Sequence, residues 1–278
     1  MLNASIVLYQ HSFDTIKPLV ETLRASDFIF DIFLIDNSPS ANADFEKLPV
    51  TYIFTGKNLG YGAGHNIAMR ETLKKNVPYH LVVNPDIAFE PEILEKIVDF
   101  MDKNTNIGLL MPKILYPDGE IQYLCKLLPT PFDLIFRRFL PQSWTRKRTE
   151  KFEMRASGYD KVMDVPYLSG CFMFFRTEAL REVGLFDERF FLYPEDLDIT
   201  RRMRRKFRTV FYPHVSVVHY HERSSYKNFR MLWVHIVNMI KYFNKWGWFC
   251  DAERKRVNRE TMKQYFSQCH EIKIKSIN

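Results

Sequence analysis

Two acidic side chains, Asp36 and Asp86, stand where apolar runs of the sequence end. A carboxylate that follows a buried strand points off the edge of its sheet. There Asp86 can share Mg²⁺ or Mn²⁺, which prefer oxygen ligands, with the phosphates of a substrate, and Asp36 can accept hydrogen bonds from a nucleobase or ribose. Asp and Asn also favour turns, so a turn is the simpler explanation of Asp36-Asn37 and of Asn84-Pro85-Asp86 when each is taken alone.

A second acidic group, Glu195-Asp196-Leu197-Asp198, opens a predicted helix. One of these carboxylates could act as a general base that takes the proton of an acceptor hydroxyl while a diphosphate leaves. Acids in a first helical turn are also favoured by the helix dipole, so a purely structural role stays open.

Histidine closes the last apolar run of the predicted sheet. His219 ends the run that starts at Val215, and His221 and Ser224 follow it. A neutral imidazole after a strand can bind a metal ion. A single histidine is more often structural, and the second one leaves both explanations open.

A glycine-rich loop runs from Asn58 to Asn66, with Gly60, Gly62 and Gly64 at the start of a predicted helix. Glycines let a ligand approach the backbone, and a helix N-terminus favours phosphate. The loop lacks the spacing of the dinucleotide-binding fingerprint and the Gly-Lys-Ser/Thr ending of a P-loop. Asn66 is mildly unfavourable inside a helix, which indicates either a polar role or a side chain that faces solvent.

Short apolar runs that alternate with helical spacing have to position these groups. Strands separated by helices imply right-handed crossovers and a Rossmann-like, mainly parallel α/β sheet. Ligands of such sheets bind at the carboxyl ends of the strands, so Asp36, the glycine loop and Asp86 should share one edge. The predicted strands are 4–9, 29–35, 51–54, 80–83, 107–111, 167–176, 209–212 and 215–219. The predicted helices are 16–23, 60–76 and 226–246, with further ones that begin at 91, 177 and 195.

The chain of 278 residues has a formal net charge of +7 and 46% apolar residues. This composition is globular, and the length suffices for a substantial core. The positive charge favours anionic partners, whether nucleic acid, acidic lipid or a nucleotide diphosphate. The cysteines form no Cys-x-x-Cys pair, and neither a secretory signal nor an uncharged apolar run of about 18 residues is found. We therefore expect a reduced, cytoplasmic protein without a transmembrane span.

The order of these motifs resembles the family-2 glycosyltransferases, in the rhamnosyltransferase-like branch of bacterial surface polysaccharide assembly. The resemblance covers roughly residues 3–225 and continues more weakly to about residue 247. The residues that carry it are Ser5 to Tyr9, Ile35 to Ser38, Asn58 to Asn66, Asn84 to Ile87, Leu168 to Gly170, Gly184 to Glu188, Phe190-Phe191, Glu195 to Asp198, and His219 with Ser224.

The resemblance implies a GT-A fold and an inverting enzyme with Mg²⁺ or Mn²⁺ as cofactor. A glycosyltransferase domain at 1–225, with a variable basic and aromatic insertion at about 126–160, would precede a C-terminal helical extension at 226–278. The enzyme would move a sugar, with rhamnose among the expected ones, from a nucleotide-diphosphate donor to a hydroxyl of a glycan or lipid-linked acceptor.

The resemblance also implies roles for single residues. Asp196 would be the catalytic base with Glu195 beside it, and Gly170 and Glu195 would contact the acceptor. Asp36 would hold the base or ribose of the nucleotide. The donor site as a whole would consist of Tyr9, Asp36, Asn58, Gly60, Gly64, Asn66, Asn84 and Asp86.

The metal ligands implied by the resemblance are Asp86 and His219. Asp86 would be the last acid of the DxD-type motif of the family, whose first acid is replaced here by Asn84. One carboxylate fewer predicts weak metal binding in the resting enzyme, so that the nucleotide would bring the metal with it.

Three other classes of protein fit parts of the pattern. A nucleic-acid-binding module would use the charge but leaves the acidic loops unexplained, so nucleic acid is not an expected partner. A nucleotidyltransferase would carry a glycine-rich basic loop after the first strand, where residues 9–12 have no glycine. A non-catalytic protein that binds anionic ligands would have no use for Asp86, Asp196 and His219.

The predicted helix at 226–246 is amphipathic. Trp233, Trp246 and Trp248 suit a headgroup layer, and lysines flank the apolar stripe. A helix packed on the sheet is the alternative. Together with the basic residues of the 126–160 segment, the interfacial alternative predicts peripheral attachment to the anionic inner face of the cell membrane.

Overall fold

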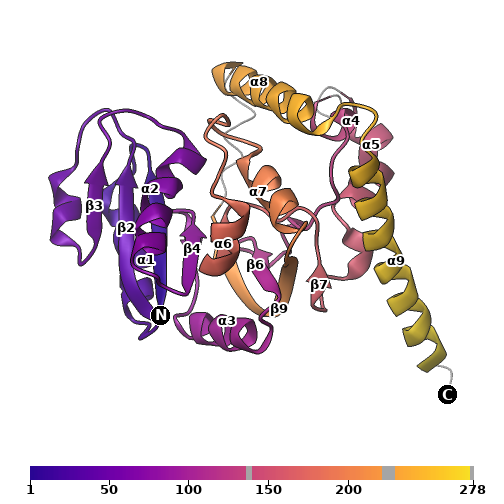
Figure 1. Cartoon of the computed structure of the whole chain (residues 1–278), viewed down its shortest axis with the longest axis horizontal. Coiled ribbons are helices and arrows are strands. Elements are labelled where there is room, and N and C mark those ends of the chain that lie inside the picture. The colour runs from indigo at the N-terminus through magenta and orange to yellow at the C-terminus, as the bar shows by residue number, and fades with distance from the viewer. Residues whose placement is uncertain (136–139, 221–228, 276–278) are drawn as a thin grey trace.

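A nine-stranded sheet crosses the molecule in the order β3-β2-β1-β4-β8-β6-β9-β5, with β7 beside β9 (Figure 1). The computed structural model describes residues 1–135, 140–220 and 229–275. The strands are β1 (Leu2–Leu8), β2 (Ile29–Asp36), β3 (Thr51–Phe54), β4 (Tyr79–Val83), β5 (Ile87–Ala88), β6 (Ile107–Leu115), β7 (Met163–Asp164), β8 (Phe172–Arg176) and β9 (Arg208–His219). The α-helices are α1 (Phe13–Arg24), α2 (Tyr61–Lys74), α3 (Glu92–Lys103), α4 (Pro131–Leu134), α5 (Gln142–Phe152), α6 (Thr177–Val183), α7 (Glu195–Met203), α8 (Phe229–Trp246) and α9 (Ala252–Lys275).

The predicted α/β class is confirmed, and the sheet is parallel in its first half and mixed in its second. Strands β3, β2, β1 and β4 run parallel, as their helical connections require. Strand β8 runs antiparallel to both of its neighbours, β4 and β6, whereas β6 and β9 are again parallel. The antiparallel β8 brings its N-terminal end to the edge where β4 ends.

Helices α1 and α2 cover opposite faces of the parallel half, because side chains alternate along its strands. Ile6 and Leu8 of β1 join the core cluster that includes Leu19 of α1. Phe33 and Ile35 of β2 point the other way and pack in a separate cluster with Ala68 of α2. Each strand end is thus held between two helices, which fixes the loops that follow.

The face of β1 beneath α2 carries a buried polar chain. The Ser5 hydroxyl lies 2.7 Å from Nδ1 of His65 and 2.8 Å from Nε2 of His80. Thr72 contacts the other ring nitrogen of His80 at 2.7 Å and accepts a hydrogen bond from Asn3. Burial lowers the pKa of His65 well below its ordinary value and that of His80 to about 3. Both rings are therefore neutral parts of the fold.

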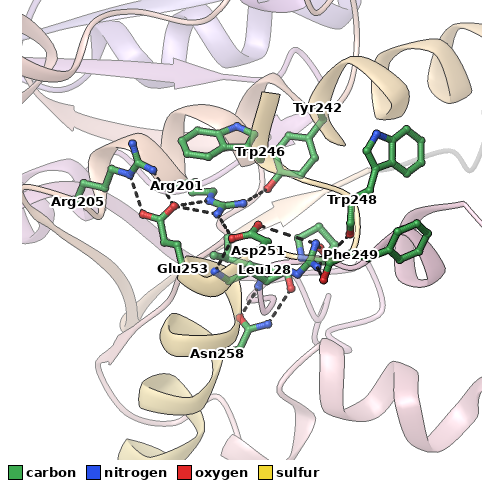
Figure 2. A network of polar contacts seen from close by, with 12 residues as sticks. Leu128, Arg201, Arg205, Tyr242, Trp246, Trp248, Phe249, Asp251, Glu253 and Asn258 are labelled. Carbon is green, nitrogen blue, oxygen red and sulfur yellow. Dashed lines mark hydrogen bonds and ion pairs between the residues drawn. The ribbon is translucent and has the colours of Figure 1, made fainter. Parts of the chain in front are cut away.

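Helix α7 is tied to the two C-terminal helices by a network around Arg201 (Figure 2). Its guanidinium donates to Asp251 and Glu253 at 2.8 Å each and lies 4.2 Å from the ring centre of Trp246. The Trp246 indole in turn donates to Asp198 of α7 at 2.8 Å. Trp246, which was expected to suit a headgroup layer, is therefore half-buried and packs against α7 and the core.

Within the described part of the region without a clear sequence period, the chain forms helices α4 and α5. Helix α9 lies in the predicted C-terminal helical extension, although its apolar residues follow no strong stripe. The two strands expected at 209–212 and 215–219 form the single strand β9, whose pairing with β6 shifts register between Pro112 and Lys113. Among the residues that the structure describes, no helix is both long and apolar enough to cross a bilayer.

We predict that the buried histidines make the fold sensitive to acid. Their folded pKa values lie below the unfolded value of about 6.5. The unfolded chain therefore binds more protons as the pH falls from 6.5 towards the folded pKa, which is about 3 for His80. The free energy of unfolding should then fall by up to about 1.4 kcal/mol per pH unit for each histidine. Urea titrations at several pH values measure this slope.

The variant His80→Gln should make that slope shallower by up to the share of one histidine. The matched control is His214→Gln, because the His214 side chain is exposed. Equal slopes for His80→Gln and the parent protein would show that His80 does not cause the acid sensitivity.

Candidate active site

Several strand ends meet at one edge of the sheet. Val83, at the end of β4, pairs with Phe172 at the start of β8. Ile87 of β5 pairs with His219 at the end of β9. Three different segments consequently bring Asn84 and Asp86, Gly170, and His219 to the same edge, as the sequence predicted for Asp86.

The hydroxyl of Tyr61 connects two of these segments to helix α2. It lies 2.6 Å from the carbonyl oxygen of Gly170 and 3.1 Å from Oδ1 of Asn84, and both atoms accept its proton. Burial raises the pKa of Tyr61 well above its ordinary value. The hydroxyl therefore stays protonated and fixes the first turn of α2 against the ends of β4 and β8.

Asp196 and Glu195 are both buried at the start of α7. One carboxylate oxygen of Asp196 accepts from the backbone N–H of Gly170 at 3.0 Å, and the other accepts from Leu197 N–H at 2.7 Å. These donors hold the carboxylate in one orientation and favour its charged form. Gly170, expected at the acceptor, also positions this carboxylate.

The two acids share one environment in which a single charge is favoured. Burial raises the pKa of Asp196, and burial together with the Asp196 charge raises the pKa of Glu195 well above its ordinary value. Oε2 of Glu195 is buried without a hydrogen-bond partner among the described residues. Asp196 therefore carries the charge while Glu195 stays protonated, which is the arrangement that a general base needs.

Lys126 is a cation beside this pair that the sequence did not single out. Its positive charge acts on Asp196 and on the Cys171 thiol, opposing the effect of burial on both pKa values. Its Nζ also lies 5.2 Å from the ring centre of Tyr167. Only the fold indicates a role for Lys126, because this residue stands at the start of the segment without a clear sequence period.

Asp86 and His219 face each other across the edge. Nε2 of His219 lies 3.4 Å from Oδ1 of Asp86. The amide nitrogen of Gln122 donates to the carbonyl oxygen of His219, so its Oε1 faces Nδ1 of the ring at 2.9 Å and accepts the Nδ1 proton. In the neutral ring Nε2 is then the nitrogen that can bind a metal ion.

This pair fits a weak divalent metal site. Neighbouring ligands of Mg²⁺ or a similar ion lie about 3 Å apart, which is close to the 3.4 Å between these two atoms. Within the described part of the chain, no group of three or more His, Cys, Asp or Glu side chains could hold a metal. An ion here would need further ligands, such as water or phosphate oxygens. His221 and Ser224 lie outside the described residues.

Asp36 lies at the end of β2 with both oxygens engaged by its own loop. Oδ1 accepts from Ser38 N–H at 2.9 Å, and Oδ2 accepts from the Tyr52 hydroxyl at 2.7 Å. These bonds within the turn are compatible with the predicted contact between Asp36 and the nucleotide, since each carboxylate oxygen can accept further hydrogen bonds. Tyr9 is half-exposed in the loop after β1.

His11, in the loop after β1, is a second residue that sequence reasoning passed over. Burial lowers its pKa, against the charges of Asp86 and Asp36, which place the ring near both carboxylates. Its Nδ1 accepts from Tyr9 N–H at 3.0 Å, so a neutral ring carries its proton on Nε2. His11 can therefore donate a hydrogen bond from Nε2 near Asp86 and Asp36.

The glycine loop is packed against the protein itself. A Cβ at Gly60 would lie 2.2 Å from the carbonyl oxygen of Phe191, and one at Gly64 would lie 2.8 Å from Val7. Gly60 also has a φ of +87°. Asn58, which is exposed, accepts from Gly60 N–H at 2.9 Å. Close packing of neighbouring segments therefore requires these glycines whether or not a ligand binds beside them.

Asn66 has a structural task of the same kind. Its amide nitrogen donates to the carbonyl oxygen of Phe186 and to Glu188, both at 2.9 Å, and its oxygen accepts from Phe186 N–H at 3.0 Å. Both amide protons are thus used within the protein. Asn66 holds the loop that leads to α7, which explains the polar residue in a buried helix.

The half-parallel sheet, with Asp86, Glu195 and Asp196 as acids near its carboxyl edge, has the architecture of the GT-A glycosyltransferases. The solved structure of GalNAc-T7 with UDP, GalNAc and Mn²⁺ shares the fold, with a TM-score of 0.57, 15% identity and coverage of 78% of this chain and 43% of that one. S. aureus TarS 1–349 matches with a TM-score of 0.56, 16% identity and coverage of 96% and 72%.

The sequence profile described as "Glycosyltransferase like family 2" matches residues 39–236, and the chain belongs to this family. The chain is 28% identical over 213 residues to the N-acetylglucosaminyl-diphospho-decaprenol L-rhamnosyltransferase of Mycobacterium tuberculosis, covering 70% of this chain and 67% of the relative. It is 26% identical over 255 residues to the rhamnosyltransferase WbbL of Escherichia coli K12, covering 87% and 92%.

The predicted family, its rhamnosyltransferase-like character and the predicted enzyme class are thereby confirmed. The chain is a glycosyltransferase of polysaccharide synthesis. Nothing in the fold or in these relatives favours a nucleotidyltransferase or a non-catalytic binding protein.

We predict that Asp196→Asn lowers the rate of sugar transfer by at least about 10²-fold, the low end for a positioned acid–base group. Asn keeps the size of the side chain but cannot accept the proton. Donor binding should change little, so KM for the donor and kcat are measured separately. The rate of the parent enzyme should fall with decreasing pH at a pKa above that of an ordinary aspartate.

The control is Glu195→Gln, which preserves a neutral side chain where we expect a protonated acid. It should reduce the rate much less than Asp196→Asn. The opposite order would assign the base to Glu195.

Proposed function

We propose that this enzyme transfers a sugar, with rhamnose the first choice, from a nucleotide-diphosphate donor to a hydroxyl of a lipid-linked or glycan acceptor. The observation that carries the proposal is the Asp196 carboxylate, held by two backbone donors on the edge that also carries Asp86 and His219. The names of the mycobacterial and E. coli relatives support rhamnose, and the mycobacterial name supports a diphosphate-linked lipid acceptor.

The reaction is a single displacement that inverts the anomeric carbon. The acceptor oxygen forms a bond to that carbon as the bond to the diphosphate oxygen breaks, and the acceptor proton passes to Asp196. Glu195, which stays protonated, can donate a hydrogen bond to an acceptor oxygen. A covalent enzyme intermediate is not needed.

The donor would lie along the sheet edge between the loops that follow β1, β2 and β4. Asp36 would accept hydrogen bonds from the base or ribose, and Tyr9 would contact the base from the adjacent loop. The carbonyl and amide groups around Asn84 would face the sugar. Lys126 is the cation near the base, where a second phosphate-bearing substrate would also need one.

Asp86 and His219 would hold Mg²⁺ or Mn²⁺ together with the phosphates of the donor. When bound, such an ion stabilises the negative charge of the leaving diphosphate. Two structures of the same fold contain Mn²⁺, which supports the proposal without placing an ion here.

We place the enzyme in the cytoplasm, attached peripherally to the inner face of the membrane. Cys125 and Cys171 are free thiols, which suits a reducing compartment. The surface of α5 favours membrane contact, because Trp144 is 78% exposed and Arg146 and Lys147 beside it are exposed cations. Indole and cationic side chains together suit an anionic headgroup layer. Arg137 and Arg138 of the same segment lie outside the described residues.

We predict that transfer requires a divalent metal bound by the Asp86 and His219 pair. Asp86→Asn and His219→Gln should each lower the transfer rate by at least about 10²-fold, since a metal supplies several kcal/mol of charge stabilisation. They should also abolish the Mn²⁺-dependent rise in unfolding temperature caused by nucleoside diphosphates. At 100 times its Kd, a ligand adds about 2.7 kcal/mol of stability to the parent protein.

Glu90→Gln, which alters an exposed acid four residues after Asp86, should change neither measurement. Undiminished transfer by the parent enzyme in excess EDTA would exclude the metal.

We predict that the parent protein co-sediments with anionic vesicles at low salt and less at high salt. The combined variant Trp144→Ser, Arg146→Gln and Lys147→Gln should bind at least about tenfold more weakly, at roughly 1 kcal/mol per cation removed. Phe30→Ser removes an exposed aromatic residue from β2 and serves as the control. If the variant and the parent co-sediment equally, or neither does, α5 is not a membrane contact.

A further inference from the structure

A cavity of about 500 Å³ lies between the segment 127–133, helix α5 and helix α9. In Figure 1, α5 and α9 lie side by side on the opposite side of the molecule from β3. The volume falls within the range of about 300–1,000 Å³ typical of sites for small organic ligands. None of the residues proposed to bind donor or metal lines it.

The interior of the cavity is apolar. Leu127, Leu128 and Phe152 are buried there, and Met262 of α9 is half-buried at its side. These side chains offer no hydrogen bonds. A ligand that fills the cavity must therefore bring a hydrophobic part.

The rim of the cavity is positively charged. Arg148, Lys151, Arg259 and Lys263 line it with exposed side chains, against the single carboxylate of Asp133. Four cations and one anion leave a net charge of +3 for the lining. Asp133 is also already bonded to Arg148 at 2.7 Å. The rim thus favours an anionic group on the same ligand.

The wall of the cavity is fixed. Leu128 exchanges two hydrogen bonds with the Asn258 side chain of α9, at 2.8 and 2.9 Å (Figure 2). Leu127 N–H donates to the carbonyl oxygen of Phe152 at 3.0 Å. The cavity is therefore preformed, and a ligand would not have to order its walls before binding.

The same segment borders the catalytic site. Lys126, whose charge acts on Asp196, directly precedes Leu127 and Leu128. Its backbone N–H donates to Tyr167, which anchors the segment on the side of the sheet edge. A long ligand could therefore pass from the base to the cavity along this short stretch of chain.

We propose that the cavity binds the lipid end of a lipid-linked acceptor, with one flexible apolar chain inside and a phosphate group at the cationic rim. The inference rests on the proposed function for the sugar at the other end of this acceptor. A membrane phospholipid shares the chemistry, but its two chains would need more apolar volume, and the short stretch of chain between Lys126 and the cavity favours the acceptor.

The test uses farnesyl monophosphate, kept below its micelle concentration, and measures its binding to the full chain by calorimetry without any sugar donor. The parent protein should bind it at least about tenfold more tightly than farnesol or inorganic phosphate alone. Lys151→Gln combined with Arg259→Gln should weaken binding by about fivefold for each cation removed. Met262→Glu, which places a carboxylate beside the chain, should weaken it further.

The matched control is Lys161→Gln combined with Lys255→Gln, which removes the same charge from two exposed lysines outside the cavity. It should bind farnesyl monophosphate like the parent. The proposal would be overturned if both double variants weakened the binding of farnesyl monophosphate equally, or if the parent bound inorganic phosphate as tightly as farnesyl monophosphate. Either result would show that net charge alone causes the binding.

The unfolding temperature of each variant shows whether it is folded. If Met262→Glu does not fold, the variants that remove cations still test the proposal. Binding to phosphatidylglycerol vesicles without binding of farnesyl monophosphate would overturn the proposal in favour of a membrane contact. If the enzyme transfers sugar but does not bind farnesyl monophosphate, the cavity is not a lipid site, and the proposed function is unaffected. Binding without transfer from any nucleotide sugar would instead count against the proposed function.

Discussion

The need to compensate buried charge on helix α7 governs the architecture. Glu195, Asp196, Asp198 and Arg201 are all buried on this one helix, and a buried charge is costly unless it is paired or hydrogen-bonded. Their partners come from distant parts of the chain. The backbone at Gly170 serves Asp196, and residues of α8 and α9 serve Asp198 and Arg201. The C-terminal helices therefore complete the charge balance of the helix that carries the proposed base.

That balance separates the two ends of α7 by function. From Asp198 onward the helix is locked, because Asp198 and Arg201 each have two charged partners. At its first turn, Asp196 has only backbone donors, and Glu195 keeps one buried oxygen without a partner among the described residues. Incomplete compensation raises both pKa values, so the reactive end of α7 depends on the stability of the other end.

Local signals predicted the parallel half of the fold and the residues at its edge. Asp86 follows a strand and Asp196 lies in the first turn of a helix. The order of such motifs along the chain indicated its family. The roles of the glycine loop and of Asn66 were harder to predict, because glycine and asparagine serve ligands and tight packing equally well. Only coordinates reveal that Phe191 and Val7 occupy the space beside Gly60 and Gly64.

What the sequence could not reveal lies in the segment 126–160 and in its contacts with the last helix. Residues there have no period that marks a face, because α4 and α5 are short and α9 is mostly polar. The role of Lys126 depends on the charge of Asp196, which lies 70 positions along the chain. The position of Leu128 depends on two hydrogen bonds to Asn258, 130 positions along the chain. Features made by such long-range contacts leave no local pattern. The cavity between this segment, α5 and α9 is consequently a feature that only the folded chain defines.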